Sequence, residues 1–308
     1  MVLSSLLFSY LIYEILSAFV KTSAGRRKLG NVYLGGNIKD TAALPLLKEV
    51  KDGDYGVFEL SSWQLQGFGD AKVSPNLALF TTFLPDHLNY YKGDMEKYFS
   101  DKANIYRNQK EGDVLFMRPV VAEFIEEKGI EKKGDSFVVD KRLIPKNWKV
   151  KLLGEHNMEN VALAIASAME VGVADNIIKK TVENFTGVPG RLQFIREWKG
   201  IKFYNDTTAT TPDGVIAAMD SLKNYKGKII LIGGGADKGL DYKEYAEIIP
   251  KSAKNIILFK GAASEKIIKE LSLGHGMSKL KNDAVIGVES MKDALKNRIA
   301  PELKNVSL

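Results

Sequence analysis

The sequence predicts an α/β protein, with a mostly parallel sheet flanked by helices and a second, smaller α/β domain after it. Two observations predict this fold. Short apolar runs rich in strand-forming residues alternate with helical stretches, which is typical of parallel strands joined by helices. The Gly- and Pro-rich segment TGVPGR, residues 186–191, interrupts this alternation, and a second series follows it. We therefore predict domains at residues 1–188 and 189–308.

Composition narrows the class of protein and the chemistry. The chain has 308 residues, of which 45% are hydrophobic and 27% charged, so disordered and fibrous classes are excluded. Lys and Arg exceed Asp and Glu by six, and the pI of about 9.1 suits a phosphorylated substrate as well as nucleic acid. The absence of cysteine excludes disulfides, thiolate nucleophiles and zinc sites built on sulfur.

The first twenty residues, MVLSSLLFSYLIYEILSAFV, are apolar enough to fit a buried or half-buried helix, a single membrane-spanning helix or a signal peptide. Positive charge follows this run, beginning at Lys21, whereas a signal peptide carries it in front. Glu14 also interrupts the run, which would be costly at the centre of a bilayer. These features favour the buried helix and leave the other two interpretations open.

The remaining elements of the first domain follow from short patterns. We expect helices to begin at Asp40 and Asp94, and strands at VYL, YGVFEL, NLALFTTF and VLFM, within residues 32–34, 55–60, 76–83 and 114–117. Two more helices are expected at NMENVALAIASAMEVG and ADNIIKKTVENF, residues 157–172 and 174–185.

The second domain begins with RLQFIREWKGIKFYND, residues 191–206, which indicates two strands joined by a glycine turn. A helix capped near Thr211 follows. The apolar runs KIILIGGG, NIILFKG and AVIGV, within residues 228–235, 255–261 and 284–288, then predict three strands, each leading toward a helix.

Three residues carry candidate chemistry. Glu59 ends the strand YGVFE, and His87 follows the strand NLALFTTF beside Asp86. Ligands bind beyond the carboxyl ends of the strands in open α/β sheets, so neighbouring strands would bring these groups to one edge. Lys102 shares a helix face with Tyr98, where a desolvated amine becomes reactive. The structural alternatives are a solvated carboxylate, a structural histidine and a snorkelling lysine.

Several longer motifs occur together, between about Tyr33 and Tyr242. They are GGNI, ELSSWQL, PDHLNYY, SDKANIY, GEHNMENVALAIA, the region of Arg191, YNDTTATTPDG and LIGGGADKGLDY. With these motifs the chain resembles the Mur ligase family, and within it the members that add D-glutamate. ELSSWQL together with NDTTATTPDG is the most discriminating combination. The run GGGADKG lacks the G-x-G-x-x-G spacing of a dinucleotide loop, because Lys238 falls at the third glycine.

The resemblance implies a central ATP-binding domain with a mostly parallel sheet and a smaller, Rossmann-like C-terminal domain. It implies a cytoplasmic ligase of peptidoglycan synthesis, which joins D-glutamate to UDP-N-acetylmuramoyl-L-alanine through an acyl phosphate, using ATP and Mg²⁺. We expect no nucleic-acid partner, no membrane partner, and a monomer for the complete enzyme.

The resemblance also implies roles for individual residues. Glu59 and His87 would hold Mg²⁺ together with Lys102, carbamylated by carbon dioxide. Asn37 and His87 would lie near the phosphates and the muramoyl substrate. The nucleotide would meet Asn157 and Asn160 at adenine and ribose, Arg191 at the phosphates and Asp206 at the ribose. Thr210 and Lys238 would receive the D-glutamate carboxylates, a role that suits a hydroxyl and an ammonium.

The chain departs from the family pattern in three ways. No G-x-x-x-x-G-K-[ST] phosphate loop occurs in it, and it stops at PELKNVSL, where the family pattern continues. Gly190 stands where relatives often carry histidine, and Thr208 where some carry lysine. We therefore expect a ligase chain shortened at both ends, whose activity alone is open. A non-catalytic nucleotide-binding or scaffold fragment, and a piece completed by another chain, are the alternatives. NDTTATTPDG argues against a folate-polyglutamating relative.

Overall fold

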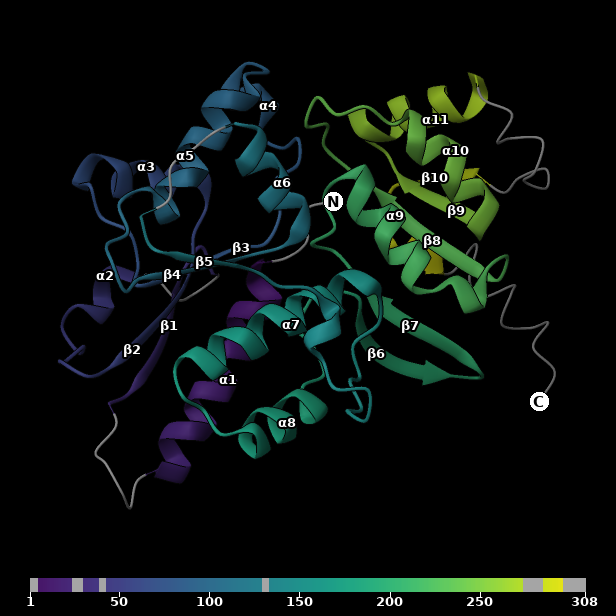
Figure 1. Cartoon of the computed structure of the whole chain (residues 1–308). Helices are drawn as coiled ribbons and strands as arrows, with labels where there is room; N and C mark the ends of the chain where they lie inside the picture. Colours follow the sequence, from purple (N-terminus) through teal and green to yellow (C-terminus); the bar gives the residue numbers. More distant parts are fainter. Residues whose placement is uncertain (1–4, 24–29, 39–42, 129–132, 274–284, 296–308) are drawn as a thin grey trace. The chain divides into compact units, whose positions relative to one another are not determined.

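The computed structural model describes residues 5–23, 30–38, 43–128, 133–273 and 285–295 (Figure 1). The chain divides into two compact units. The N-terminal unit contains the described residues up to 85 and residues 91–188. The C-terminal unit contains the described residues from 189 onward, together with the short segment 86–90.

The elements up to residue 188 alternate between strands and helices. The strands are β1 (Val32–Gly36), β2 (Tyr55–Glu59), β3 (Leu77–Phe80), β4 (Val114–Met117) and β5 (Asp135–Val138). The helices are α1 (Ser5–Ser23), α2 (Ala43–Leu46), α3 (Ser62–Ala71), α4 (Leu88–Tyr91), α5 (Met95–Arg107), α6 (Pro119–Glu127), α7 (Glu155–Glu170) and α8 (Asp175–Asn184), with the 3₁₀ turn η1 (Lys141–Leu143).

The apolar N-terminal segment forms α1, a helix with one buried face. Leu7, Leu11 and Ile15 lie at helical spacing and are at most 1% exposed, while Glu14 lies on the exposed side. This face packs on α7 and α8 in one hydrophobic cluster. The prediction of a buried or half-buried helix is confirmed. In the part of the chain that the structure describes, no helix is long and apolar enough to cross a bilayer.

The predicted parallel strands are present, but they belong to two sheets. In the described residues, β1 pairs with β2, and β3, β4 and β5 form a second parallel sheet in that order. The expectation that the strands before Glu59 and His87 are neighbours in one sheet is therefore wrong. Val57 of β2 and Leu79 of β3 contact the same hydrophobic cluster, so side-chain packing relates the two sheets without a shared ladder.

Helices cover both faces of the β3–β4–β5 sheet. Phe80, Leu115 and Met117 pack against α5 and α6, whereas Val114 and Phe116 pack against α7. This is the layered arrangement that places ligand groups at the carboxyl edge of a parallel sheet. The strand β5 and the helix α6 were not predicted. β5 is largely exposed, so it lacks the apolar pattern that reveals buried strands.

The C-terminal unit has a hairpin followed by a parallel sheet. The hairpin joins β6 (Gln193–Trp198) to β7 (Ile201–Asn205) in antiparallel register. Lys199 and Gly200 both have positive φ, as a two-residue type I′ turn requires. The predicted pair of strands about a glycine turn is confirmed.

The rest of this unit alternates as predicted. It contains α9 (Pro212–Ser221), the 3₁₀ turn η2 (Lys223–Tyr225), β8 (Ile229–Gly234), α10 (Lys243–Ser252), β9 (Ala253–Phe259), α11 (Ala262–Leu273), β10 (Val285–Val288) and α12 (Met291–Ala294). Thr211 caps α9, its hydroxyl accepting from the Gly214 amide, as expected. The sheet order is β10–β9–β8, all parallel (Figure 1). The expected helix start at Asp40 and the terminal PELKNVSL lie outside the described residues.

Candidate functional site

Asn37 and Glu59 come together at the carboxyl ends of β1 and β2. Gly36 pairs with Glu59 in the parallel ladder, and the Asn37 amide donates to the Glu59 carbonyl over 2.7 Å. Gly36 has φ +100°, and a Cβ on it would lie 2.0 Å from that carbonyl oxygen, so only glycine fits. Glu59 is only 8% exposed. This edge therefore brings Asn37 and the carboxylate of Glu59 to the place where sheets of this kind bind ligands.

Lys102 lies on α5, a helix capped by Asp94, which accepts from the Lys97 amide. Its ammonium lies 5.3 Å from the centre of the Tyr98 ring, on the shared helix face that the sequence predicted. The side chain is half-buried. The face of the Tyr98 ring attracts the ammonium, so this contact holds the Lys102 side chain in place on the helix.

A hydrogen-bonded network beside Lys102 was missed by sequence reasoning. The Asp101 carboxylate accepts from the Tyr91 hydroxyl at 2.9 Å and from the Gln66 amide at 2.6 Å. Gln66 lies on α3, which begins three residues after Glu59. The network therefore ties the helix that follows Glu59 to the helix that carries Lys102. Gln66 directly follows the motif ELSSWQL, and no local pattern pairs residues 35 positions apart.

His87 has a left-handed backbone, with φ +54°. Its amide donates to the Asp86 carboxylate over 2.8 Å, and its Nε2 lies 3.7 Å from the other Asp86 oxygen. Asp86 is only 7% exposed. A non-glycine residue in this conformation is uncommon, and here the hydrogen bond from the His87 amide to the Asp86 carboxylate supports the turn.

Asn157 and Asn160 lie on the first turns of α7, as predicted. Asn157 is 6% exposed and donates to the Leu153 carbonyl over 2.7 Å. Asn160 is fully buried, and both polar atoms of its amide lack a hydrogen-bond partner among the described residues. Leaving a buried amide unsatisfied costs free energy, so a ligand group or a water that reached it would be favoured.

Arg118, at the carboxyl end of β4, is a second group that sequence reasoning missed. Its Nε lies 3.7 Å from Glu159 on α7, and burial lowers the pKa of its guanidinium while the Glu159 charge opposes that shift. A charged residue directly after the buried strand VLFM was the available signal, the same one that marked Glu59. Its partner Glu159 directly precedes Asn160 on α7, and Arg118 itself lies at the carboxyl edge of the sheet, where ligands bind.

In the C-terminal unit, Arg191 and Asp206 meet at the base of the hairpin. Arg191 donates to the Thr208 carbonyl over 2.8 Å, and the Leu192 amide donates to the Asp206 carboxylate over 2.8 Å. Burial raises the pKa of Asp206, and the Leu192 hydrogen bond and the Arg191 charge oppose the shift. The structure thus brings these two predicted nucleotide residues together.

Thr210 and Lys238 also meet, although 28 residues separate them: the Lys238 ammonium donates to the Thr210 hydroxyl over 3.0 Å. Both side chains are exposed. The neighbouring Asp237 is held by an ion pair with Lys266 of α11, which lowers the pKa of its carboxyl. This ion pair fixes the loop that carries Lys238.

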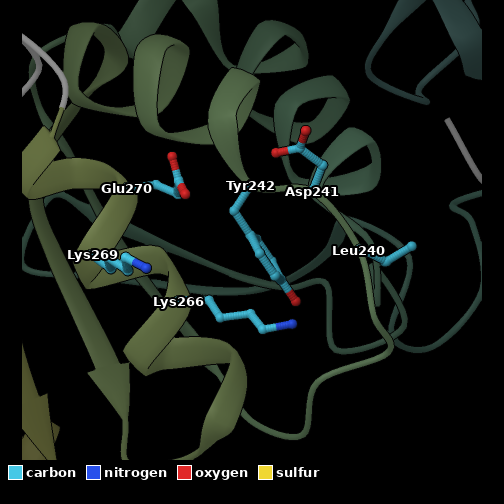
Figure 2. A pocket seen from close by; sticks show the side chains of 6 residues that line it. All are labelled: Leu240, Asp241, Tyr242, Lys266, Lys269 and Glu270. Atoms are coloured by element: carbon cyan, nitrogen blue, oxygen red, sulfur yellow. The ribbon is translucent and has the colours of Figure 1, made fainter.

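A pocket of about 260 Å³ lies beside this loop, and Figure 2 shows its lining. The hydroxyl of Tyr242 lies close to the ammonium of Lys266, and Lys269 and Glu270 of α11 complete the rim (Figure 2). The pocket contains none of the residues that the sequence predicted. Its lysines and acids are mixed, so its charge selects no particular class of ligand.

Glu59 is the carboxylate of the predicted metal ligands that lies at a strand end. Within the described ranges, no cluster of three or more His, Asp or Glu side chains could hold a metal ion by itself. Mg²⁺ commonly uses one or two carboxylates and completes its shell with water and phosphate oxygens, so Glu59 at its strand end fits such a partial site.

Two family profiles match nearly the whole chain. The profile described as "Mur ligase middle domain" matches residues 8–168, and "Mur ligase, glutamate ligase domain" matches residues 190–307. The chain belongs to the Mur ligase family. The resemblance inferred from ELSSWQL and NDTTATTPDG is thereby confirmed, and the two matched ranges leave the segment about TGVPGR between them.

Curated Mur ligases match at moderate identity. The chain is 33% identical over 278 residues to a UDP-N-acetylmuramoylalanine–D-glutamate ligase of Roseiflexus sp. (strain RS-1), covering 80% of this chain and 59% of the relative. It is 36% identical over 264 residues to the ligase of that name from Acetivibrio thermocellus, covering 78% and 54%. The chain thus spans somewhat more than half the length of these relatives.

Solved Mur ligases share the fold. MurF from Acinetobacter baumannii matches with a TM-score of 0.68 at 19% identity, over 96% of this chain and 68% of that one. MurF from Thermotoga maritima, solved in complex with ADP, matches with a TM-score of 0.62 at 18% identity, over 97% and 78%. The predicted α/β fold is therefore confirmed.

Proposed function

We propose that this chain carries the catalytic groups of an ATP-dependent ligase that joins D-glutamate to UDP-N-acetylmuramoyl-L-alanine in peptidoglycan synthesis, in the cytoplasm. The observation that carries the proposal is the 3.0 Å contact between Lys238 and Thr210, which presents an ammonium and a hydroxyl together. A dicarboxylate such as D-glutamate would be recognised by such a pair. The names of the curated relatives support the same substrate.

In this proposal each unit has its own part of the chemistry. We assign residues 1–188 to the central ATP-binding domain and residues 189–308 to the domain that receives the amino acid. Asn157 and Asn160 would approach the adenine and ribose, Asp206 the ribose, and Arg191 the phosphates. Asn37 and His87 would lie near the phosphates and the muramoyl substrate.

The reaction would proceed through an acyl phosphate. ATP phosphorylates the substrate carboxylate, the amine of D-glutamate attacks the acyl carbon, and phosphate leaves as the amide forms. Mg²⁺, when bound, would neutralise charge on the transferring phosphoryl group. Glu59, His87 and a carbamylated Lys102 would hold it. The Lys102 amine would add to carbon dioxide and lose a proton, which converts a cation into an oxygen ligand.

Phosphate release from the full chain tests this function, with UDP-N-acetylmuramoyl-L-alanine, D-glutamate, ATP and Mg²⁺. We expect Lys102→Ala to reduce turnover by at least about a hundredfold, because it removes a metal ligand. Lys97→Ala removes an exposed lysine of the same helix and should leave turnover unchanged. Carbon-dioxide-free buffer should slow the wild type, and added bicarbonate should restore it.

A non-catalytic nucleotide-binding or scaffold role is the alternative. We keep this alternative because the chain spans 54–59% of the length of its two cited relatives. A folded chain that binds ATP without releasing phosphate would support the non-catalytic role. Turnover that survives Lys102→Ala would instead remove Lys102 from the proposed site. The oligomeric state follows from the mass in solution, for which we propose a monomer, or a complex if a second chain completes the enzyme.

A further inference from the structure

The hairpin of β6 and β7 exposes an unusual number of aromatic and aliphatic side chains. Phe194 and Ile195 are each 51% exposed and Trp198 is 43% exposed, and five of the six residues of β6 are exposed. Soluble surfaces rarely gather large apolar side chains on one short strand without a binding partner. We call the exposed side chains of residues 194–202, on both faces of the hairpin, together with those of residues 223–228, the hairpin surface.

Cations are interleaved with these rings. The Arg196 guanidinium lies 5.7 Å from the centre of the Trp198 ring and 6.0 Å from that of Phe203, and the Lys199 ammonium lies 5.5 Å from Trp198. Lys202 donates to the Tyr225 hydroxyl over 3.1 Å, which joins the hairpin to η2. The hairpin surface carries six cations against one acid, Glu197; the cations are Arg196, Lys199, Lys202, Lys223, Lys226 and Lys228.

Two kinds of partner fit this surface poorly. An added strand would need a regular ladder along β6, but the register shifts between Phe194 and Arg196, and charged side chains occupy the edge. A stacked nucleic-acid base would need the open face of an aromatic ring. Arg196 and Lys199 already lie over the ring of Trp198, which is 43% exposed.

An anionic lipid surface fits the same features better. Tryptophan prefers the boundary between apolar chains and water, and lysine and arginine reach from there to lipid phosphates. Six cations and three half-exposed apolar side chains, spread over both faces of one hairpin and the turn beside it, supply both the electrostatic and the apolar part of such binding. We propose that the hairpin surface docks this chain on an anionic phospholipid bilayer.

The proposal is compatible with an active site in the same unit. Trp198 and Ile201 form the tip of the hairpin, whereas Gln193 and Asn205 form its base, next to Arg191 and Asp206. Strands of this length separate tip and base by about 17 Å. The proposal departs from the expectation of no membrane partner. The sequence FIREWKGIKF predicts a hairpin, but it does not show that Phe194, Ile195 and Trp198 are exposed. It does not depend on the proposed ligase activity.

Co-sedimentation of the full chain with vesicles tests the proposal. We expect binding to vesicles of phosphatidylcholine and phosphatidylglycerol, none to phosphatidylcholine alone, and release at high salt, where screening is strong. Reversing Arg196, Lys199 and Lys202 to Glu should weaken the partition coefficient at least about a hundredfold, since each lost cation costs about fivefold. Trp198→Ala should weaken it several-fold at unchanged charge.

Matched controls separate this surface from net charge and from misfolding. Reversing Lys48, Lys51 and Lys146 to Glu makes the same change in net charge at exposed sites of the N-terminal unit, and it should weaken binding far less. Phe137→Ala removes a ring that is 49% exposed elsewhere and should have no effect. Circular dichroism checks that each variant folds.

Three outcomes would overturn the proposal. The first is no binding of the wild type to anionic vesicles. The second is an equal loss of binding in the two triple reversals, which would leave only a net-charge effect. In a third arm, the hairpin variants would lose affinity for a single-stranded oligothymidine, measured by fluorescence anisotropy, while their vesicle binding stays intact. That result would identify the hairpin surface as a nucleic-acid site.

Discussion

Gly190 and Thr208, the two local departures from the family pattern, contact each other. The Gly190 carbonyl accepts from both the amide and the hydroxyl of Thr208. Gly190 has φ +76°, and a Cβ on it would lie 3.1 Å from the Thr208 methyl group and 3.2 Å from the Thr207 hydroxyl. A larger side chain at 190 therefore competes with the threonine loop for space.

Gly190→Ala tests this contact, with Gly200→Ala as its control. Both glycines have nearly the same φ, +76° and +75°, but a Cβ at Gly200 meets nothing within 4 Å. Each substitution should cost about 1 kcal/mol of unfolding free energy through backbone strain. Gly190→Ala should cost about 1 kcal/mol more, from crowding against Thr207 and Thr208. Urea denaturation measures the unfolding free energy of each variant. Equal losses in the two variants would show that Thr207 and Thr208 move aside at little cost.

Asp206 gives a pH-dependent prediction. Burial raises the pKa of its carboxyl above the ordinary 3.8, so the folded chain binds this proton more tightly than the unfolded chain. The stability from that proton is fully present below 3.8 and is lost as pH rises through the higher folded value. Asp206→Asn keeps an oxygen acceptor for the Leu192 amide and does not titrate.

The unfolding free energy of Asp206→Asn, relative to wild type, should therefore rise between about pH 4 and about pH 7. Urea titrations at several pH values measure it, and taking the difference cancels the other carboxyls. A difference that falls with rising pH would mean that the Arg191 charge outweighs burial.

At the scale of elements, the close packing of α3 on α5 decides where Lys102 lies. A Cβ on Gly69 of α3 would lie 2.4 Å from the Asn104 amide nitrogen. Asn104 is 7% exposed and donates to the Leu65 carbonyl over 3.0 Å, so it has little freedom to move aside. Glycine at 69 thus allows the contact between these helices.

Alanine at two positions of α3 should have opposite effects. Gly67→Ala meets nothing within 4 Å and should stabilise the chain by about 0.8 kcal/mol through helix propensity. Gly69→Ala makes the same gain but disrupts the buried Asn104 bond, at a cost of about 1–3 kcal/mol. Thermal or urea unfolding checks the signs. Stabilisation by both would show that α3 and α5 separate easily.

Elements set by neighbouring residues could be predicted from the sequence. The hairpin about Gly200, the cap at Thr211 and the helix from Asp94 each depend on a few adjacent residues, and all are present. The pairing of strands depends on residues far apart, so nothing local shows that β2 and β3 lie in different sheets. The exposed β5 has no buried face to leave a pattern.

Some residues of the candidate site could likewise be predicted from local sequence, whereas others depend on contacts between distant residues. Glu59 could be found because it ends an apolar strand, and His87 because it lies in the loop after another, while the meeting of Lys238 with Thr210 agrees with the family motifs. The Asp101 network and the Arg118 contact with Glu159 could not, because their partners lie on separate helices and strands. Polar contacts of this kind depend on tertiary packing, which no short spacing encodes.

At the scale of the whole molecule, each unit has its own hydrophobic core. Leu11 is fully buried in the cluster of α1, α7 and α8, and Ile249 is fully buried in the cluster about α10 and β9. The two matched family profiles follow the same division, at residues 8–168 and 190–307. A unit with its own core is expected to unfold as a cooperative body of its own.

We therefore predict two transitions in scanning calorimetry of the full chain. Leu11→Ala and Ile249→Ala should each remove about 2–5 kcal/mol from one unit, because each leaves a cavity in a filled core. The first should lower the midpoint of one transition and the second that of the other, while Leu47→Ala, at a site 74% exposed, should change neither. If both core variants lowered a single shared transition equally, the two units would unfold together. A substitution in either core would then destabilise the structure around both Lys102 and Lys238.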